Sequence, residues 1–398
     1  MNISPFLLLC GAGLLAIFSS TISKSPVLPL FAAHLGADPA GIGLVAAVSA
    51  FTGVAVSLPA GLLSDRLGRR HILLLAALVF ASAPFLYLLV GHIWQLMLVR
   101  LYHGLATAIF MPVAMALVAD LHQGSRGEKI GWFSTATLLG RFAAPVAGGG
   151  ILTLLAANPG AGFRGVYLVC ALAGVLVLAL AWFLPAGPAR QTRGQSWGQT
   201  WGAFRRIMAN RLIFLTCLGE AAVLFAYGTF EVFLPLYSLQ AGMGAWEVGI
   251  FLSAQVITLA LSKPLLGRFS DRHGRPPQIF AGCLLGAVCI GAFPWLGSFW
   301  SLLGLSVLFG LSLSVVTSAS AAFIADQCHD QGRGSAMGLL GSIMDLGHTS
   351  GPLLGGLAAA WLGLAASFWL AALVIGLTAL IFGWVVLKAR PPAASRSC

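Results

Sequence analysis

The stretch Gly61-Leu-Leu-Ser-Asp65-Arg66-Leu-Gly68-Arg69-Arg70 decides the fold, because it recurs 206 residues later as Gly267-Arg-Phe-Ser-Asp271-Arg272-His-Gly274-Arg275. Each copy is a short charged segment with two glycines, placed between two apolar runs. The chain therefore consists of two related halves. Further equivalent residues follow at shifts of 206 and 207: Asp120 and Asp326, Gly140 and Gly347, Pro145 and Pro352, Gly148 and Gly355, Gly149 and Gly356.

The composition identifies the apolar runs as membrane spans. Of 398 residues, 59% are hydrophobic and 8% are charged, whereas soluble proteins are about 25% charged. This excludes a soluble enzyme, a disordered protein and a disulfide scaffold. A spanning helix needs about 20 mostly apolar residues, and twelve segments qualify, the first read as an uncleaved span: 5–31, 41–63, 72–91, 93–119, 130–156, 165–185, 212–238, 246–268, 277–297, 299–325, 334–361 and 365–387.

The number of spans in each repeat predicts the architecture. Six spans lie between equivalent points, and an even number gives the two halves the same orientation in the membrane. This is the parallel-repeat plan of rocking transporters, with the substrate site near the membrane midplane. We expect an all-α membrane protein of two pseudo-symmetric six-helix bundles, 1–185 and 212–388, a cytoplasmic linker, 186–211, and a cytoplasmic tail, 389–398.

The net charge of +11 is explained by topology. The chain has 22 basic and 11 acidic residues, and seventeen of the basic ones fall on one side of the predicted spans, with Arg164 alone on the other. By the positive-inside rule both termini are cytoplasmic, and nucleic acid is not needed as a partner. The basic linker, which contains Trp197 and Trp201, is either an amphipathic helix on the membrane surface or a plain connection.

Three segments resemble those of the major facilitator superfamily. The stretch from Gly61 and its echo match that family's signature loop. Arg100-Leu-Tyr-His-Gly104 matches a motif of its fourth span. Gly140-Arg-Phe-Ala-Ala144-Pro145-Val-Ala-Gly148-Gly149 resembles an element of twelve-span drug/proton antiporters, departing at Ala144, where the family has Gly; Gly351-Pro352-Leu-Leu-Gly355-Gly356 repeats it in full.

The resemblance implies roles for the motif residues. The charged loops are expected to form a latch on the cytoplasmic side, in which Asp120 and Asp326 pair with Arg69 and Arg275. Gly61 should allow two helices to approach closely, and Gly68 should supply a turn. The proline and small residues of the antiporter element are expected to bend a span. The latch residues are Gly61, Asp65, Arg66, Gly68, Arg69, Asp120, Gly267, Asp271, Arg272, Arg275 and Asp326, and the bend residues are Gly140, Pro145, Gly148, Gly149, Gly351, Pro352, Gly355 and Gly356.

Ionisable residues inside predicted spans are the candidates for mechanism, because a charge in hydrocarbon is costly unless it is paired or hydrated. The first span carries Lys24 and no acid. A coupled proton would therefore use Glu220, Glu231 or Asp345, the last with His348 one helical turn later. Lys263 either acts in the cavity or extends toward the cytoplasmic interface.

The repeat also suggests charge pairs. Glu231 lies one residue from the equivalent of Lys24, so the two are predicted to pair in the outer half; alternatively, each extends toward the outer interface. Arg141 is equivalent to His348. Lys24, Arg100 and Arg141 are the candidate substrate-cavity cations. For Arg100 the resemblance implies a buried structural or proton-relay role.

These observations favour a secondary active transporter that exports hydrophobic or amphiphilic small molecules, such as drug-like compounds, by proton-coupled alternating access. It is expected in a bacterial-type inner membrane, as a monomer, with the proton as coupling ion and no other cofactor. The alternative is proton-coupled uptake, or an organic-anion or metabolite carrier of the same fold. A membrane enzyme or sensor is disfavoured, because no nucleotide loop, soluble domain or metal motif is present, and no metal site is expected.

Overall fold

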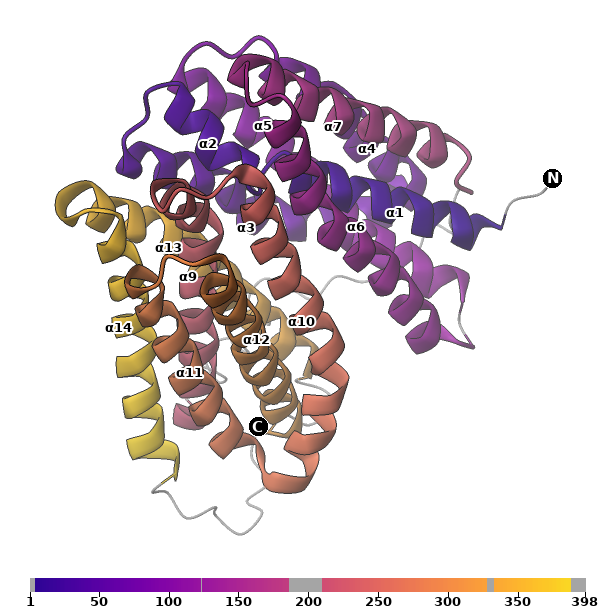
Figure 1. The fold of residues 1–398 in the computed structure, drawn as a ribbon. Helices are drawn as coiled ribbons and strands as arrows, with labels where there is room; N and C mark the ends of the chain where they lie inside the picture. The colour runs from indigo at the N-terminus through magenta and orange to yellow at the C-terminus, as the bar shows by residue number, and fades with distance from the viewer. Residues whose placement is uncertain (1–3, 123, 186–209, 328–332, 388–398) are drawn as a thin grey trace. The chain divides into compact units, whose positions relative to one another are not determined.

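A computed structural model describes residues 4–122, 124–185, 210–327 and 333–387. Within these residues the secondary structure is helical (Figure 1). The first half contains α1 (Pro5–Ile22), α2 (Val27–His34), α3 (Pro39–Leu67), α4 (Arg69–Tyr87), α5 (Ile93–Leu121), α6 (Arg126–Leu154) and α7 (Pro159–Trp182). The second contains α9 (Arg211–Gln240), α10 (Ala245–His273), α11 (Arg275–Ala292), η1 (Phe293–Trp295), α12 (Phe299–Gln327), α13 (Arg333–Leu362), α14 (Leu364–Phe382) and η2 (Gly383–Leu387).

The helices confirm the predicted spans. Eleven helical segments of the described chain are long and apolar enough to cross a membrane. The remaining predicted span, 334–361, corresponds to α13. The structure agrees with an all-α membrane protein of twelve spans. The predicted linker, 186–211, falls almost entirely outside the described residues.

The first predicted span contains a break in its helix. The segment 5–31 is divided into α1 and α2 by a turn at 23–26. Pro26 lacks the amide hydrogen that a helix interior needs, and its ring disfavours helical conformation in the residue before it. The turn places Lys24 at the junction of the two helices, where its side chain is half-buried.

Internal contacts divide the chain into two units, residues 1–193 with 238–253 and residues 194–237 with 254–398. In the first unit, α1 packs against α6 and α7, α3 against α5, and α4 against α5 and α7. In the second, α11 packs against α12 and α14, and α13 packs against α14 (Figure 1). The predicted domain boundaries stay a prediction.

Strips of small residues bring particular helices close together. On α6, a side chain added at Gly140 would overlap the backbone oxygen of Leu14 in α1, and Ala144 and Gly148 continue the strip at intervals of four. On α13, Gly347, Gly351 and Gly355 form the equivalent strip against α9. Helices that meet through small residues can approach to backbone contact. The antiporter-like element therefore forms a helix–helix seam in each half.

Candidate functional site

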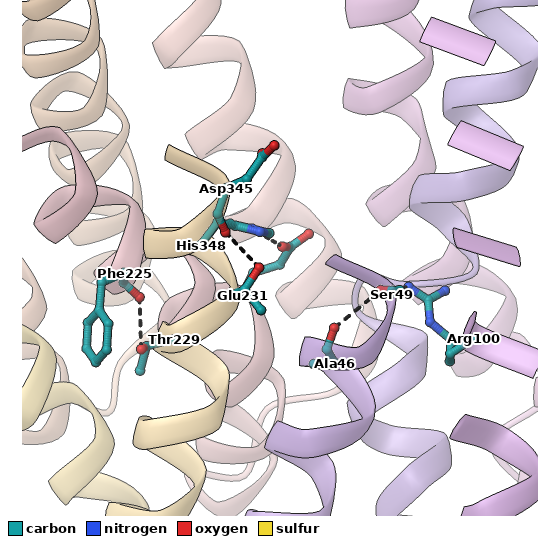
Figure 2. Close-up of polar contacts among 9 residues, drawn as sticks. Ala46, Ser49, Arg100, Phe225, Thr229, Glu231, Asp345 and His348 are labelled. Carbon is teal, nitrogen blue, oxygen red and sulfur yellow. Dashed lines mark hydrogen bonds and ion pairs between the residues drawn. The ribbon is translucent and has the colours of Figure 1, made fainter. Parts of the chain in front are cut away.

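Arg100 in α5 is the most buried cation among the charges expected inside spans, with 5% of its surface exposed. Its Nη1 donates to the Tyr87 hydroxyl at 3.2 Å and to the Ser23 hydroxyl at 3.5 Å, and its Nη2 donates to the Ser49 hydroxyl at 2.8 Å. Figure 2 shows the Ser49 contact. Each of these partners is neutral. The guanidinium therefore joins the α1–α2 turn, α3, α4 and α5 without a carboxylate partner in the described chain.

An aromatic group adjoins this cation. His103, one turn after Arg100 in α5, lies with its Nδ1 3.3 Å from the Tyr87 hydroxyl. Tyr87 stacks in parallel on Tyr167 of α7, with ring centroids 4.2 Å apart. All three rings are buried. Tyr87 and Tyr167 have no sequence motif that could have identified them, because their proximity to Arg100 depends on how α4, α5 and α7 pack.

Glu220 in α9 is the most buried acid of the second unit, with 1% of its surface exposed. Its Oε2 has no hydrogen-bond partner among the described residues. Its polar surroundings are Lys263 of α10, Ser320 of α12 and Cys283 of α11. No salt bridge joins Glu220 to a cation in the part of the chain that is described.

Glu231, His348 and Asp345 gather where α9 meets α13. The Oε2 of Glu231 lies 3.3 Å from Nε2 of His348, and the ring of Tyr227 lies 5.3 Å from the imidazole. Figure 2 shows Asp345 and His348 on one helix, with the imidazole directed toward Glu231. Glu231 is buried, whereas Asp345 is exposed. Gly228 lacks a side chain where the backbone of His348 approaches, which allows this contact.

The remaining candidate cations are less buried than Arg100. Arg141 lies on an exposed part of α6, and Lys263 on an exposed part of α10. Lys24 belongs to the first unit and Glu231 to the second, and their pairing stays a prediction.

The charged loop of the first half contains an enclosed ion pair. The Nε of Arg69, at the start of α4, lies 3.1 Å from Oδ2 of Asp120 near the end of α5, and Nη1 donates to the Ser64 hydroxyl at 2.5 Å. Gly68 precedes Arg69 with φ of 90°, a conformation that glycine adopts readily. The ion pair and the glycine turn agree with the sequence expectation.

The second half repeats this arrangement in a more exposed form. Arg275 donates through Nε to Asp326 at 2.5 Å and through Nη1 to Ser270 at 3.3 Å, and its Nη2 lies 2.9 Å from Asp271. Gly274 has φ of 89°. Ser64 and Ser270 are equivalent at the shift of 206, a signal that could have found them.

Other latch residues make fewer contacts. Arg66 and Arg272 are exposed, and the side chain of Asp65 lies outside those described. A Cβ atom added at Gly61 or at Gly267 would meet nothing within 4 Å among the described atoms. Within the described residues no other helix comes that close to Gly61, so the close approach expected there stays a prediction, whereas close approaches occur at the seams.

The bend residues of α6 and α13 contact different neighbouring helices. Gly140 and Gly148 face α1 and the α1–α2 turn, whereas a side chain at Gly149 would overlap the backbone of Ala245 in the first turn of α10. In α13, Gly351 and Gly355 contact Phe225, Thr229 and Phe233 of α9. Pro145 and Pro352 are buried inside α6 and α13, and Gly356 is buried as well. These contacts account for the small residues, while the bend itself stays a prediction.

The family model described as Major Facilitator Superfamily matches residues 9–256 and 245–397. The chain belongs to the major facilitator superfamily. As a member of this superfamily it is a multi-pass membrane transporter. It lies in a lipid bilayer and has a small molecule as its substrate.

The similarity to individual relatives covers nearly the whole length of this superfamily member. Multidrug resistance protein MdtG of Serratia proteamaculans (strain 568) is 28% identical over 381 residues, covering 92% of this chain and 90% of that protein. MdtG of Yersinia enterocolitica (serotype O:8 / biotype 1B) is 26% identical over 383 residues, covering 94% of this chain and 91% of that protein.

Solved structures of transporters share the fold. A bacterial homologue of the human lysosomal transporter Spinster, inward-facing and unoccupied, matches with a TM-score of 0.81 at 17% identity, covering 95% of each chain. The nucleoside transporter NupG matches with a TM-score of 0.81 at 16% identity, covering 98% of this chain and 100% of that one. At these identities the likeness concerns the fold alone.

Proposed function

We propose that this transporter exports hydrophobic or amphiphilic small molecules by alternating access, driven by protons entering the cell. The observation that carries the proposal is the carboxyl group of Glu220, which is enclosed in a span with one oxygen unpartnered. An ionised carboxylate that no cation contacts directly is strongly disfavoured in an apolar surrounding. Such a group is stable when it carries a proton and loses it when a conformational change admits water, as a coupling residue must.

The two other candidate acids have surroundings less suited to this task. Glu231 contacts His348, and a hydrogen-bonding partner stabilises an ionised carboxylate. Asp345 is exposed, so its protonation is less dependent on the transport cycle. We therefore assign proton carriage to Glu220 and a secondary role in gating or substrate contact to Glu231, His348 and Asp345.

Export rather than uptake is supported by the MdtG relatives, which are named multidrug resistance proteins. The remaining expectations belong to this proposal: an inner-membrane location, cytoplasmic termini, a monomer, the proton as the only cofactor and no nucleic-acid partner. The charged loops serve as the cytoplasmic latch, because the same Arg–Asp–Ser arrangement is built in both halves.

The test begins with cells that lack or overproduce the protein, grown against a panel of toxic compounds. A compound to which overproduction confers resistance is then offered to everted vesicles, whose interior corresponds to the cell exterior. An acid interior should drive accumulation in wild-type vesicles. Glu220→Gln should abolish this accumulation while downhill exchange continues, and Glu128→Gln, on an exposed surface carboxylate, should retain it. Substrate leaving wild-type vesicles under this gradient, or pH-driven accumulation by Glu220→Gln, contradicts the proposal.

A further inference from the structure

The cluster around Arg100 has an excess of hydrogen-bond donors. The Ser23 hydroxyl donates to the backbone oxygen of Ser20 at 2.9 Å, and the Ser49 hydroxyl donates to that of Ala46 at 3.3 Å. Both hydroxyl protons are thus directed away, and both oxygens accept from the guanidinium. These serines bind the cation without neutralising it.

Tyr87 connects Arg100 to His103 through hydrogen bonds. Because the phenol oxygen accepts from Nη1 of Arg100, its own proton is free to be donated, and Nδ1 of His103 is the acceptor within reach. An imidazole whose Nδ1 accepts carries its proton on Nε2. The Nε2 atom of His103 is buried and has no partner among the described residues, so it is an unsatisfied donor.

The Nε atom of Arg100 is a second unsatisfied donor. It is buried and makes no hydrogen bond in the described chain, although an arginine Nε always carries hydrogen. Arg100 and His103 are three residues apart on α5, so their side chains share one face of the helix. Two unsatisfied donors therefore accompany a buried positive charge for which no carboxylate partner is found among the described residues.

We propose that Arg100 and His103 bind a small anion, with the Nε hydrogen of Arg100 and the Nε2 hydrogen of His103 as donors. The anion is the carboxylate of a transported amphiphile or an inorganic monovalent anion, since both offer acceptors and one negative charge. Charge-assisted hydrogen bonds are stronger than neutral ones, and an anion compensates the isolated guanidinium. Only the carboxylate source rests on the proposed function, whereas anion binding itself does not require transport.

The experiment uses the purified full-length protein in detergent, with chloride, benzoate and the neutral analogue benzamide as probes. Benzoate should raise the melting temperature saturably, and benzamide should not. Arg100→Gln should weaken benzoate binding at least tenfold, whereas Arg164→Gln, which removes an exposed cation from α7, should leave it unchanged. Equal effects of benzoate and benzamide, or undiminished benzoate binding by Arg100→Gln, overturn the proposal.

Further variants cover a failure of Arg100→Gln to fold. Arg100→Lys keeps the charge but lacks the Nε donor, so it should fold and still lose at least tenfold in benzoate affinity. His103→Gln keeps a donor and should bind benzoate better than His103→Leu; equal affinity of these two variants removes His103 from the site.

The chloride arm identifies the source of the anion. Benzoate binding, with or without competition by chloride, supports recognition of a substrate carboxylate. Stabilisation by chloride alone assigns the site to an inorganic ion and overturns the substrate role. If the wild-type protein does not bind benzoate but still transports a neutral compound, this inference fails while the proposed function stands.

Discussion

Asp120 and Asp326 each accept a hydrogen bond from the Nε of the arginine 51 residues before them, yet 9% of the Asp120 side chain is exposed against 56% of the Asp326 side chain. The two halves thus build the same ion pair in different environments. Water and salt do not replace the contacts of a carboxylate that is removed from an enclosed pair, whereas an exposed pair is already screened by water.

The first prediction follows from this difference. Asp120→Asn should destabilise the protein by about 3 kcal/mol, and Asp326→Asn by less than about 1 kcal/mol, as measured by thermal unfolding in detergent. Raising the salt concentration should shift the wild-type and Asp120→Asn melting temperatures by similar amounts. Equal destabilisation by the two substitutions would contradict the assignment of Asp120 to an enclosed pair.

The seam between α9 and α13 gives the second prediction. Gly351→Ala places a methyl group against the backbone of Phe225 and should destabilise the protein by about 2 kcal/mol, the usual cost of overpacking. Gly341→Ala, in the same helix but with open space around the new atom, should be neutral or stabilising by about 0.5 kcal/mol. If both variants melt alike, the seam does not hold these helices together.

Charge exchange tests the third prediction, the pairing of Lys24 with Glu231. Each single reversal, Lys24→Glu or Glu231→Lys, should lose transport of the resistance compound, and the double reversal should recover it. If the two side chains pair, each single reversal leaves two like charges side by side, which is costly within a membrane. A folded double variant without transport would eliminate the pair and leave Glu231 to its contact with His348.

The fourth prediction concerns topology. Cys398 should react with a membrane-impermeant maleimide only after cells are permeabilised, because the positive-inside rule places the C-terminus in the cytoplasm. In a Cys398→Ser background, Arg164→Cys should react in intact cells, since Arg164 is exposed near the start of α7 on the opposite side. The reverse labelling pattern would invert the whole topology.

Much of the fold follows from the sequence because membrane spans obey simple requirements. Apolar length predicted the segments that form α3 to α7 and α9 to α14, since a helix satisfies all its backbone groups without water. Gly68 predicted a turn and has a positive φ, and its equivalent Gly274 has one as well. The turn at 23–26 was not predicted, because hydropathy does not distinguish a broken span from a continuous one.

The candidate site was only partly accessible from sequence. The Arg69–Asp120 and Arg275–Asp326 pairs were predicted, because acid and base recur at one shift. Glu220 was identified from its depth in the span, but its unpartnered oxygen depends on packing against α11 and α12. The contacts of Arg100 with Tyr87 and Ser49 come from three helices, and no spacing along the chain encodes them.

The two seams of small residues have a mechanical consequence. Helices whose backbones are in contact cannot slide past each other. We therefore expect α1 to move with α6 as one rigid body during the transport cycle, and α9 to move with α13 in the same way. Spin labels placed within either pair should report a constant distance under every condition. Deformation must then be concentrated in helices outside the seams, which makes those helices the places where a ligand or a lipid can alter the rate of turnover.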